Sequence, residues 1–243
     1  MKTILFIFAG LLLAAPAPAG DSAGELFLNY TYKVKPDKIA EFEGIMKEWK
    51  AISQKHKVPK QMHLYSNDRM EYDLLVPLKN FAGLDQLIAD IDGLMKKMGP
   101  KKWDALEKRE RKTFDSMRIS VMRRLPKLSY RPEKPRLPGK QAQAYRADFL
   151  YLKPAAEQKA HVLFNKLKKL ATKKNLSDGW DTYVGSIGWS TPVLIVIARG
   201  KDSSDIRQNN SRPWNSPDIT SLLRKRRTVD GRHRPELSNP AYR

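Results

Sequence analysis

The chain has 243 residues, a formal net charge of +20 and 41% hydrophobic residues, and it contains no cysteine. That hydrophobic content is enough for a packed core, which argues against a wholly disordered chain. The absence of cysteine excludes disulfide bonds, thiol catalysis and cysteine-ligated metal sites.

Residues 1–19 have the three-part pattern of a secretory signal peptide. Lys2 supplies the positive charge, residues 4–13 form an apolar run, and Ala17-Pro18-Ala19 ends the segment with small residues. A membrane-spanning helix needs ~20 apolar residues, about twice the length of this run. We therefore expect cleavage after Ala19, no transmembrane segment after cleavage, and a periplasmic or secreted protein.

Residues 25–125 alternate between strand-like and helix-like patterns. Extended segments at 26–33, 62–65, 72–76 and 117–122 are predicted strands. Apolar residues recur every three or four positions between 39 and 52 and between 84 and 98, which predicts two amphipathic helices lying on a sheet. A third, short and basic helix begins near Trp103. The resulting order is β-α-β-β-α-β.

Residues 126–140 form a basic, proline-rich linker with prolines at 126, 132, 135 and 138. Segments of this composition stay extended and solvated, so we expect a stiff connector that marks a domain boundary.

Residues 141–243 repeat the plan of the first unit and end in a basic tail. Leu152-Lys153-Pro154 stands 118 residues after Val34-Lys35-Pro36, and the strands at 145–151, 180–183 and 193–197 occur in the same order around a helical pattern at 163–171. The closing strand near Arg227 is predicted to be weak. Arg146 and Asp148 fall on the helix-facing side of their strand, which indicates that one strand is slipped or frayed.

A β-α-β-β-α-β unit present twice in one chain resembles the dimeric α+β barrel superfamily. The likeness rests on segments 30–36, 37–56, 62–65 and 72–76 and on their counterparts in the second half. It implies an α+β fold of tandem ferredoxin-like units, whose antiparallel sheets pack as a pseudo-dimeric barrel around a cavity. Intramolecular pairing of the two repeats would allow a monomer. Members include cofactor-free monooxygenases, haem-binding enzymes and decarboxylases, so this fold does not by itself fix a function.

Alternation along the predicted strands separates the two faces of the sheet. Apolar residues such as Leu28, Leu64 and Leu74 take the helix-covered face, and their sequence neighbours face the cavity. The predicted ligand-binding residues are Asn29, Thr31, His63, Tyr65, Glu71, Asp73 and Arg118, with Ala147, Phe149, Tyr151, Asp181 and Tyr183 from the second half. Buried carboxylates need partners or have shifted pKa values, so such clusters are functional candidates. The alternative is a satisfied ion-pair network of Glu71, Asp73 and Arg118 on an open sheet surface.

The sequence shows no catalytic motif: no nucleophile elbow, phosphate-binding loop or HExxH helix is present. None of the four histidines has metal-ligand spacing to another. His63 alone occupies an inward strand position, which makes it the single candidate for a haem or metal ligand. We predict no metal site and no bound cofactor.

Positive charge concentrates at residues 123–140 and 224–243. The residues predicted to contact a polyanion are Arg123, Arg124, Arg224, Lys225, Arg226 and Arg227. Two functions remain open. One is an exported cell-envelope protein that binds a small organic ligand in its cavity, with oxygenase-like or haem-related chemistry. The other is a non-catalytic basic module that binds lipopolysaccharide, anionic lipid or nucleic acid through its electrostatic field.

Overall fold

The computed structural model describes residues 25–59, 61–137, 141–209, 213 and 216–234. The predicted signal peptide lies outside these residues, and its cleavage stays a prediction. None of the described helices combines the length and apolarity needed to cross a bilayer.

The two halves contain the same elements in the same order. The first half consists of β1 (Leu26–Val34), α1 (Ile39–His56), β2 (His63–Asn67), β3 (Glu71–Leu78), α2 (Ala82–Met98), α3 (Pro100–Arg111) and β4 (Phe114–Arg124), with a 3-10 turn at Pro36–Lys38. The second half consists of β5 (Ala144–Leu152), α4 (Glu157–Lys173), β6 (Trp180–Gly185), β7 (Val193–Gly200), α5 (Ser203–Asn209), α6 (Pro217–Ser221) and β8 (Leu223–His233). The predicted α+β architecture is confirmed.

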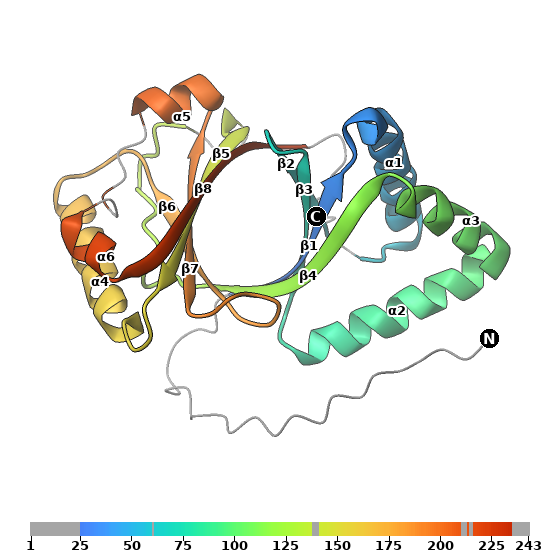
Figure 1. Cartoon of the computed structure of the whole chain (residues 1–243), viewed down its shortest axis with the longest axis horizontal. Coiled ribbons are helices and arrows are strands. Elements are labelled where there is room, and N and C mark those ends of the chain that lie inside the picture. Colours follow the sequence, from blue (N-terminus) through green and yellow to red (C-terminus); the bar gives the residue numbers. More distant parts are fainter. Residues whose placement is uncertain (1–24, 60, 138–140, 210–212, 214–215, 235–243) are drawn as a thin grey trace.

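The eight strands form one closed antiparallel barrel in the order β1-β3-β2-β8-β5-β7-β6-β4. Each half contributes a four-stranded ferredoxin-like sheet, β4-β1-β3-β2 or β8-β5-β7-β6. The sheets join at two seams, where β2 pairs with β8 and β4 pairs with β6 over three residue pairs each. Figure 1 shows the barrel end-on, with the helices of each half outside its own sheet.

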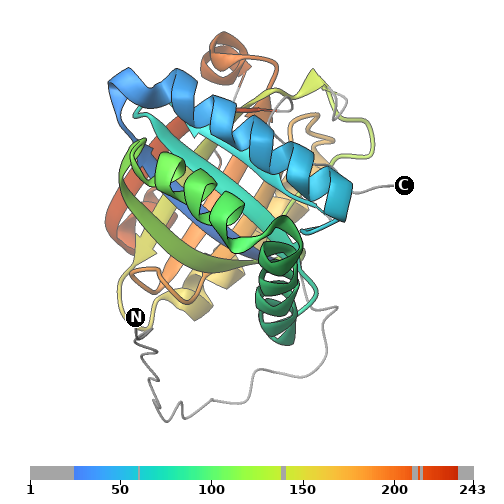
Figure 2. The same cartoon turned by 90° about the vertical axis from the view of Figure 1, so that its right-hand side faces the viewer.

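The helices cover the sheets through apolar faces. Phe42 and Ile45 of α1 are fully buried against Tyr32 and Leu64 of the first sheet, and Phe164 of α4 packs on the second sheet. Figure 2 shows α1 and α3 crossing the outer face of the first sheet. Because side chains alternate along a strand, these apolar outer positions direct the intervening polar residues into the barrel.

Strand β5 pairs without a break from Ala144 to Tyr151 with both β7 and β8, and the ladder with β8 shifts register only after Tyr151, so the expectation of a slipped or frayed strand at Arg146 and Asp148 was wrong. Arg146 donates to both oxygens of Asp230 on β8, at 2.6 and 2.8 Å. Asp148 is fully buried and accepts a 2.5 Å hydrogen bond from Thr228, with Arg226 at 3.7 Å. These cross-strand partners stabilise charges on the helix-facing side without a change of register.

The closing strand β8 is also not weak, because it runs for 11 residues and pairs with both β5 and β2. Its basic residues obscured it in the sequence. Two of them pair with carboxylates on other strands, Arg226 with Asp148 of β5 and Arg227 with Glu71 of β3, so charge does not prevent strand formation there.

Part of the connector between the halves is packed against the second half, in contrast to the expected solvated linker, whereas residues 131 and 133–136 are exposed. Leu128, Ser129 and Tyr130 are buried. Trp180 donates its indole N–H to the Leu128 carbonyl at 2.9 Å, and Tyr130 forms an isolated β-bridge with Trp180. Residues 128–130 therefore belong to the second core.

The β2–β8 seam depends on a glycine. A Cβ atom at Gly231 would lie 2.4 Å from the backbone carbonyl oxygen of Ser66 and 2.6 Å from the hydroxyl of Tyr145. No side chain fits there unless the strands separate. Gly44 in α1 serves as a control, because a Cβ atom there would meet nothing within 4 Å.

We predict that Gly231→Ala lowers the free energy of unfolding by roughly 1–3 kcal/mol, as overpacking does. Gly44→Ala should instead be neutral or stabilising by up to about 1 kcal/mol, because alanine favours a helix. Urea denaturation of both variants measures this. Equal effects of the two substitutions would show that the seam is not closely packed.

Candidate functional site

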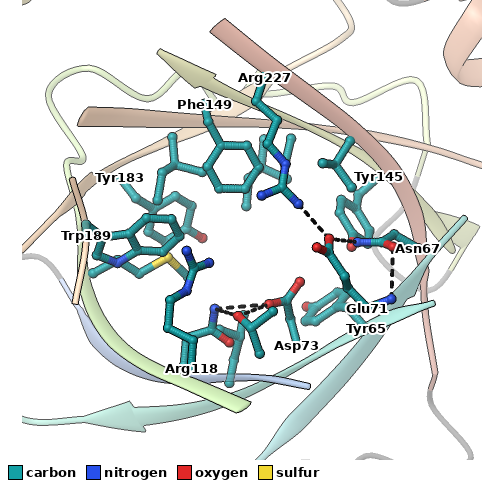
Figure 3. Close-up of a pocket in the computed structure, with 18 of the residues that line it drawn as sticks. Tyr65, Asn67, Glu71, Asp73, Arg118, Tyr145, Phe149, Tyr183, Trp189 and Arg227 are labelled. Atoms are coloured by element: carbon teal, nitrogen blue, oxygen red, sulfur yellow. Dashed lines mark hydrogen bonds and ion pairs between the residues drawn. The ribbon is translucent and has the colours of Figure 1, made fainter. Parts of the chain in front are cut away.

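The barrel encloses a polar lumen with a cavity of about 80 Å³ (Figure 3). Since one water needs roughly 10–15 Å³ in such a cavity, the lumen has room for several waters or for one small organic molecule. All eight strands contribute side chains to its wall, and Trp189 of the β6–β7 loop adds another. The lumen is thus built from both halves of the chain.

Asp73 on β3 is the central acid of the lumen. Its Oδ1 accepts a 2.6 Å hydrogen bond from the Thr31 hydroxyl and a 3.1 Å hydrogen bond from the Asn29 amide, both on β1. Burial raises the pKa of Asp73, and these two hydrogen bonds oppose the rise. No described residue donates a hydrogen bond to its Oδ2. That oxygen is left for a molecule in the lumen.

The second acid, Glu71, is neutralised by the other half of the chain. Arg227 on β8 donates to Glu71 Oε2 at 2.6 Å, and the Asn67 amide donates to the same oxygen at 2.9 Å. The Arg227 guanidinium also lies over the ring of Phe149, 5.5 Å from its centroid. The two lumen carboxylates therefore differ, since Glu71 has a cation in contact and Asp73 has neutral donors.

Arg118 on β4 projects into the lumen toward Trp189 (Figure 3). Its guanidinium lies 4.9 Å from the centroid of the Trp189 ring, and Trp189 stacks on Phe149 with centroids 5.7 Å apart. No carboxylate among the described residues forms an ion pair with Arg118. A solvent-exposed cation stacked on an aromatic face can bind the negative charge of a ligand.

Gly188 places Trp189 over the lumen. It has φ +79°, and a Cβ atom there would lie 2.3 Å from the Ile119 carbonyl oxygen of β4. Only glycine allows the β6–β7 loop to lie this close to β4.

Three buried polar atoms of lumen residues have no hydrogen-bond partner among the described residues: the Asn29 Oδ1 acceptor and the Trp189 Nε1 and Arg227 Nε donors. Asn29 is only 4% exposed. Unsatisfied buried polar groups cost free energy and call for an explanation, such as water or a ligand.

Three tyrosines complete the wall. The rings of Tyr65 and Tyr145 meet edge to face at 5.4 Å. Burial raises the pKa of Tyr145 and of Tyr183, so both phenols are protonated at neutral pH and can donate hydrogen bonds.

The structure brings together six of the seven ligand-binding residues predicted in the first half: Asn29, Thr31, Tyr65, Glu71, Asp73 and Arg118. The barrel is closed, so the alternative of an open sheet surface does not hold. From the second half, Ala147, Phe149 and Tyr183 line the lumen. Tyr151 belongs to the adjacent buried cluster, and Asp181 lies in an ion-pair cluster at one end.

His63 is the exception. Its Nε2 lies 2.9 Å from the side-chain nitrogen of Gln61, beyond the lumen wall. Burial and the nearby charge of Arg199 lower its pKa. No group of three potential metal-ligating side chains occurs in the part of the chain that the structure describes.

A haem does not fit the lumen. A macrocycle needs far more than about 80 Å³, and no histidine is among the described residues that line the lumen. We derive no chemistry through a haem.

The predicted polyanion-binding residues do not form one free surface. Arg124 is paired with Asp181 at 2.8 Å, Arg226 lies near Asp148, and Arg227 points into the lumen. Arg224 and Lys225 are exposed, and Arg123 is partly buried. Polyanion binding stays a prediction.

Sequence reasoning missed Trp189, Arg199 and the lumen role of Arg227. Arg227 follows from alternation with Val229 once β8 is known to be a full strand. Trp189 lies in a loop and gave no periodic signal.

A second, more apolar cavity of about 300 Å³ lies between the helices and sheet of the first half. Glu110 of α3 lies at its wall and accepts a 2.7 Å hydrogen bond from the Trp49 indole. Burial raises the pKa of Glu110. Residue patterning did not indicate this buried carboxyl, because its neighbours on α3 are charged.

No protein-family model and no curated protein sequence matches the chain. Solved structures do match over most of its length. A candidate monooxygenase from Lactobacillus acidophilus NCFM has 10% identity and a TM-score of 0.53, covering 90% of this chain and 98% of its own. An anthrone oxidase-like protein has 9% identity and a TM-score of 0.54, covering 88% and 92%.

A mutant chlorite dismutase from Candidatus Nitrospira defluvii has 11% identity and a TM-score of 0.56, covering 89% of this chain and 94% of its own. At such identities these similarities concern the fold. The chain has the dimeric α+β barrel fold, with both units in one polypeptide.

We predict that the free energy of unfolding of Asp73→Asn, compared with that of wild type, increases as pH rises. The pKa of Asp73 is raised in the folded state, so the folded protein holds this proton more tightly than the unfolded chain. Wild type therefore loses stability as pH rises from the ordinary carboxyl pKa through the raised value, whereas the amide of the variant cannot ionise. The oxygen of that amide can still accept from Thr31 and Asn29.

The stability difference between variant and wild type can be measured by thermal unfolding from pH 3 to pH 8, which roughly spans the ordinary and the raised pKa of this carboxyl. A stability difference that does not change with pH would contradict the raised pKa.

Proposed function

We propose that the protein binds a small aromatic molecule with a weakly acidic hydroxyl or an anionic group in the barrel lumen, and acts on it by oxygenase-type chemistry. One observation carries the proposal. Among the described residues, a single cavity with aromatic walls contains polar atoms that have no hydrogen-bond partner and a guanidinium that has no carboxylate partner. Asn29 Oδ1, Trp189 Nε1 and Arg118 supply an acceptor, a donor and a cation.

The wall chemistry defines the ligand class. The rings of Phe149, Trp189 and Tyr183 favour a flat, apolar body, and the volume limits it to about one ring. The Arg118 guanidinium, which has no carboxylate partner among the described residues, favours a negative charge at one edge. A phenol or an aromatic acid meets these conditions.

Asp73 is the candidate general base. Burial makes it a stronger base than an ordinary carboxylate, and its Oδ2 is left for a ligand proton. Thr31 and Asn29 hold its other oxygen in place. Arg118 would stabilise the anion that forms when the proton moves to Asp73.

The reaction class is supported by the similarity to a candidate monooxygenase and an anthrone oxidase-like protein. With dioxygen as the oxidant, a methylene carbon next to a phenolate would lose one proton to Asp73. The carbanion would then reduce dioxygen. One oxygen atom would become the new carbonyl, and the other would leave as water with the two hydrogens of the methylene, so no further reductant is needed. The N-terminal pattern predicts that this takes place outside the cytoplasm.

The test uses 4-nitrophenol, whose phenolate absorbs visible light, with nitrobenzene as the uncharged match. We predict that wild type binds 4-nitrophenol and holds it as the phenolate at a pH where the free compound is largely protonated. Arg118→Gln should weaken phenolate binding about tenfold or more, since a hydrogen bond to a charge is lost. Arg109→Gln, on exposed α3, should change nothing.

Two results would count against the proposal. One is equal binding of 4-nitrophenol and nitrobenzene. The other is absence of binding by a panel of one-ring phenols and aromatic acids, monitored by titration calorimetry, together with no oxygen uptake.

A further inference from the structure

Arg199 occupies one end of the lumen and also faces the outside of the barrel. It follows Ile195 and Ile197 on the inward side of β7, so alternation directs it to the interior. Yet its side chain is 45% exposed, and it lines an outer cleft of about 370 Å³ as well as the lumen. Ile197 also borders both spaces.

The connector between the halves forms the outer wall of this cleft. Tyr130, Arg131, Pro132 and Pro135 face the residues that lead into β6. Gly179 allows the close approach, because a Cβ there would lie 2.5 Å from the Tyr130 carbonyl oxygen. The outer wall of the cleft is therefore held in place by close contact between the backbone at Gly179 and at Tyr130.

Three guanidinium groups share one carboxylate at the inner end of the cleft. Arg124 contacts Asp181 Oδ1 at 2.8 Å and is nearly buried, which satisfies most of that charge. Arg131 contacts the same oxygen at 3.3 Å with its side chain 67% exposed. Arg199 is 3.6 Å from Asp181 Oδ2, beyond hydrogen-bonding distance. Asp181 thus holds Arg131 and Arg199 less closely than it holds Arg124.

The other charges near the cleft reduce this positive surplus but do not cancel it. Arg136 binds Asp178, which also lines the cleft, at 2.8 Å and Asp205 at 2.7 Å, so that cluster carries one net negative charge. The three arginines and Asp181 together carry two net positive charges. His63 is uncharged at neutral pH, since its pKa is lowered. The hydroxyl of Tyr65 is a further partner of Arg199.

We propose that this cleft is the port through which an anionic ligand reaches the lumen, and that Arg199 and Arg131 select its negative charge. The proposal rests on the lumen being the binding site, and it adds a route and two specificity-determining residues. An anion arriving in the cleft meets Arg131 first. Arg199 then exchanges its long contact with Asp181 for the anion and turns with it toward the lumen.

The cysteine-free sequence permits a test that needs no knowledge of the natural ligand. A single cysteine replaces Ala147, a small residue in the lumen wall, and Val229→Cys is the alternative if that variant fails to fold. The thiol is labelled with an anionic sulfonatoethyl and, separately, a cationic trimethylammonioethyl methanethiosulfonate. Each labelling forms a disulfide and releases methanesulfinate. The ratio of the two rates, relative to a free thiol, cancels changes in thiol reactivity.

We expect the ratio to favour the anion. Arg199→Gln should lower it by roughly 3- to 10-fold, the scale on which removal of one steering charge acts. Arg131→Gln should lower it less, and Arg109→Gln should not change it. High salt should reduce the wild-type preference, because Arg131 and Arg199 are exposed to solvent.

The port would be overturned if neither reagent labels the folded protein, or if Arg199→Gln leaves the ratio unchanged. It would also be overturned if Arg118→Gln, at the other exposed end of the lumen, lowers the ratio more than Arg199→Gln does. If 4-nitrophenol does not bind, the proposed lumen ligand is wrong. That result is separate from the port, because the labelling rates do not depend on 4-nitrophenol.

Discussion

The closed barrel depends on two short seams, each of three residue pairs, at which one half of the chain meets the other. Closure converts two polar sheet faces into the wall of a common cavity. The energetic cost is the burial of charged groups, which is tolerable only with partners. The structure supplies these partners across the halves, as in the pairing of Glu71 with Arg227. Asp73 is the acid that closure leaves with neutral donors.

This difference between the two acids gives the lumen its chemistry. Glu71 has the Arg227 guanidinium in contact, whereas desolvation raises the pKa of Asp73 and makes it retain a proton more readily. The aromatic residues come mainly from the second half and the Asp73 network from the first. Neither half alone would therefore contain both an aromatic wall and a base, which gives a physical reason for keeping two units in one chain.

The sequence predicted the fold and one side of the lumen well because periodicity reports burial directly. The alternation of Leu28, Tyr30 and Tyr32 in β1 placed Asn29 and Thr31 inside, and the repeated Lys-Pro junction revealed the two halves. The same logic failed where charge was satisfied by distant partners. Arg146 and Asp148 suggested a slipped strand only because their partners, Asp230 and Thr228, lie 84 and 80 positions away.

Other features had no periodic signal. Trp189 reaches the lumen because Gly188 adopts a left-handed conformation against β4. Leu128 and Tyr130 are buried within a segment whose prolines and charges are typical of a solvated linker. His63 has the correct strand parity but is not among the residues that line the cavity, because parity fixes the face and not the depth.

The pKa of Asp73 tests most directly whether a closed lumen desolvates this acid. It can be measured by following the side-chain carboxyl carbon by NMR in protein labelled at aspartate, with Asp73→Asn identifying the resonance. A closed lumen predicts that this carboxyl titrates above its ordinary value of 3.8. Titration at or below that value would mean that water or a cation reaches Asp73 freely, and would contradict both the closed lumen and its proposed base.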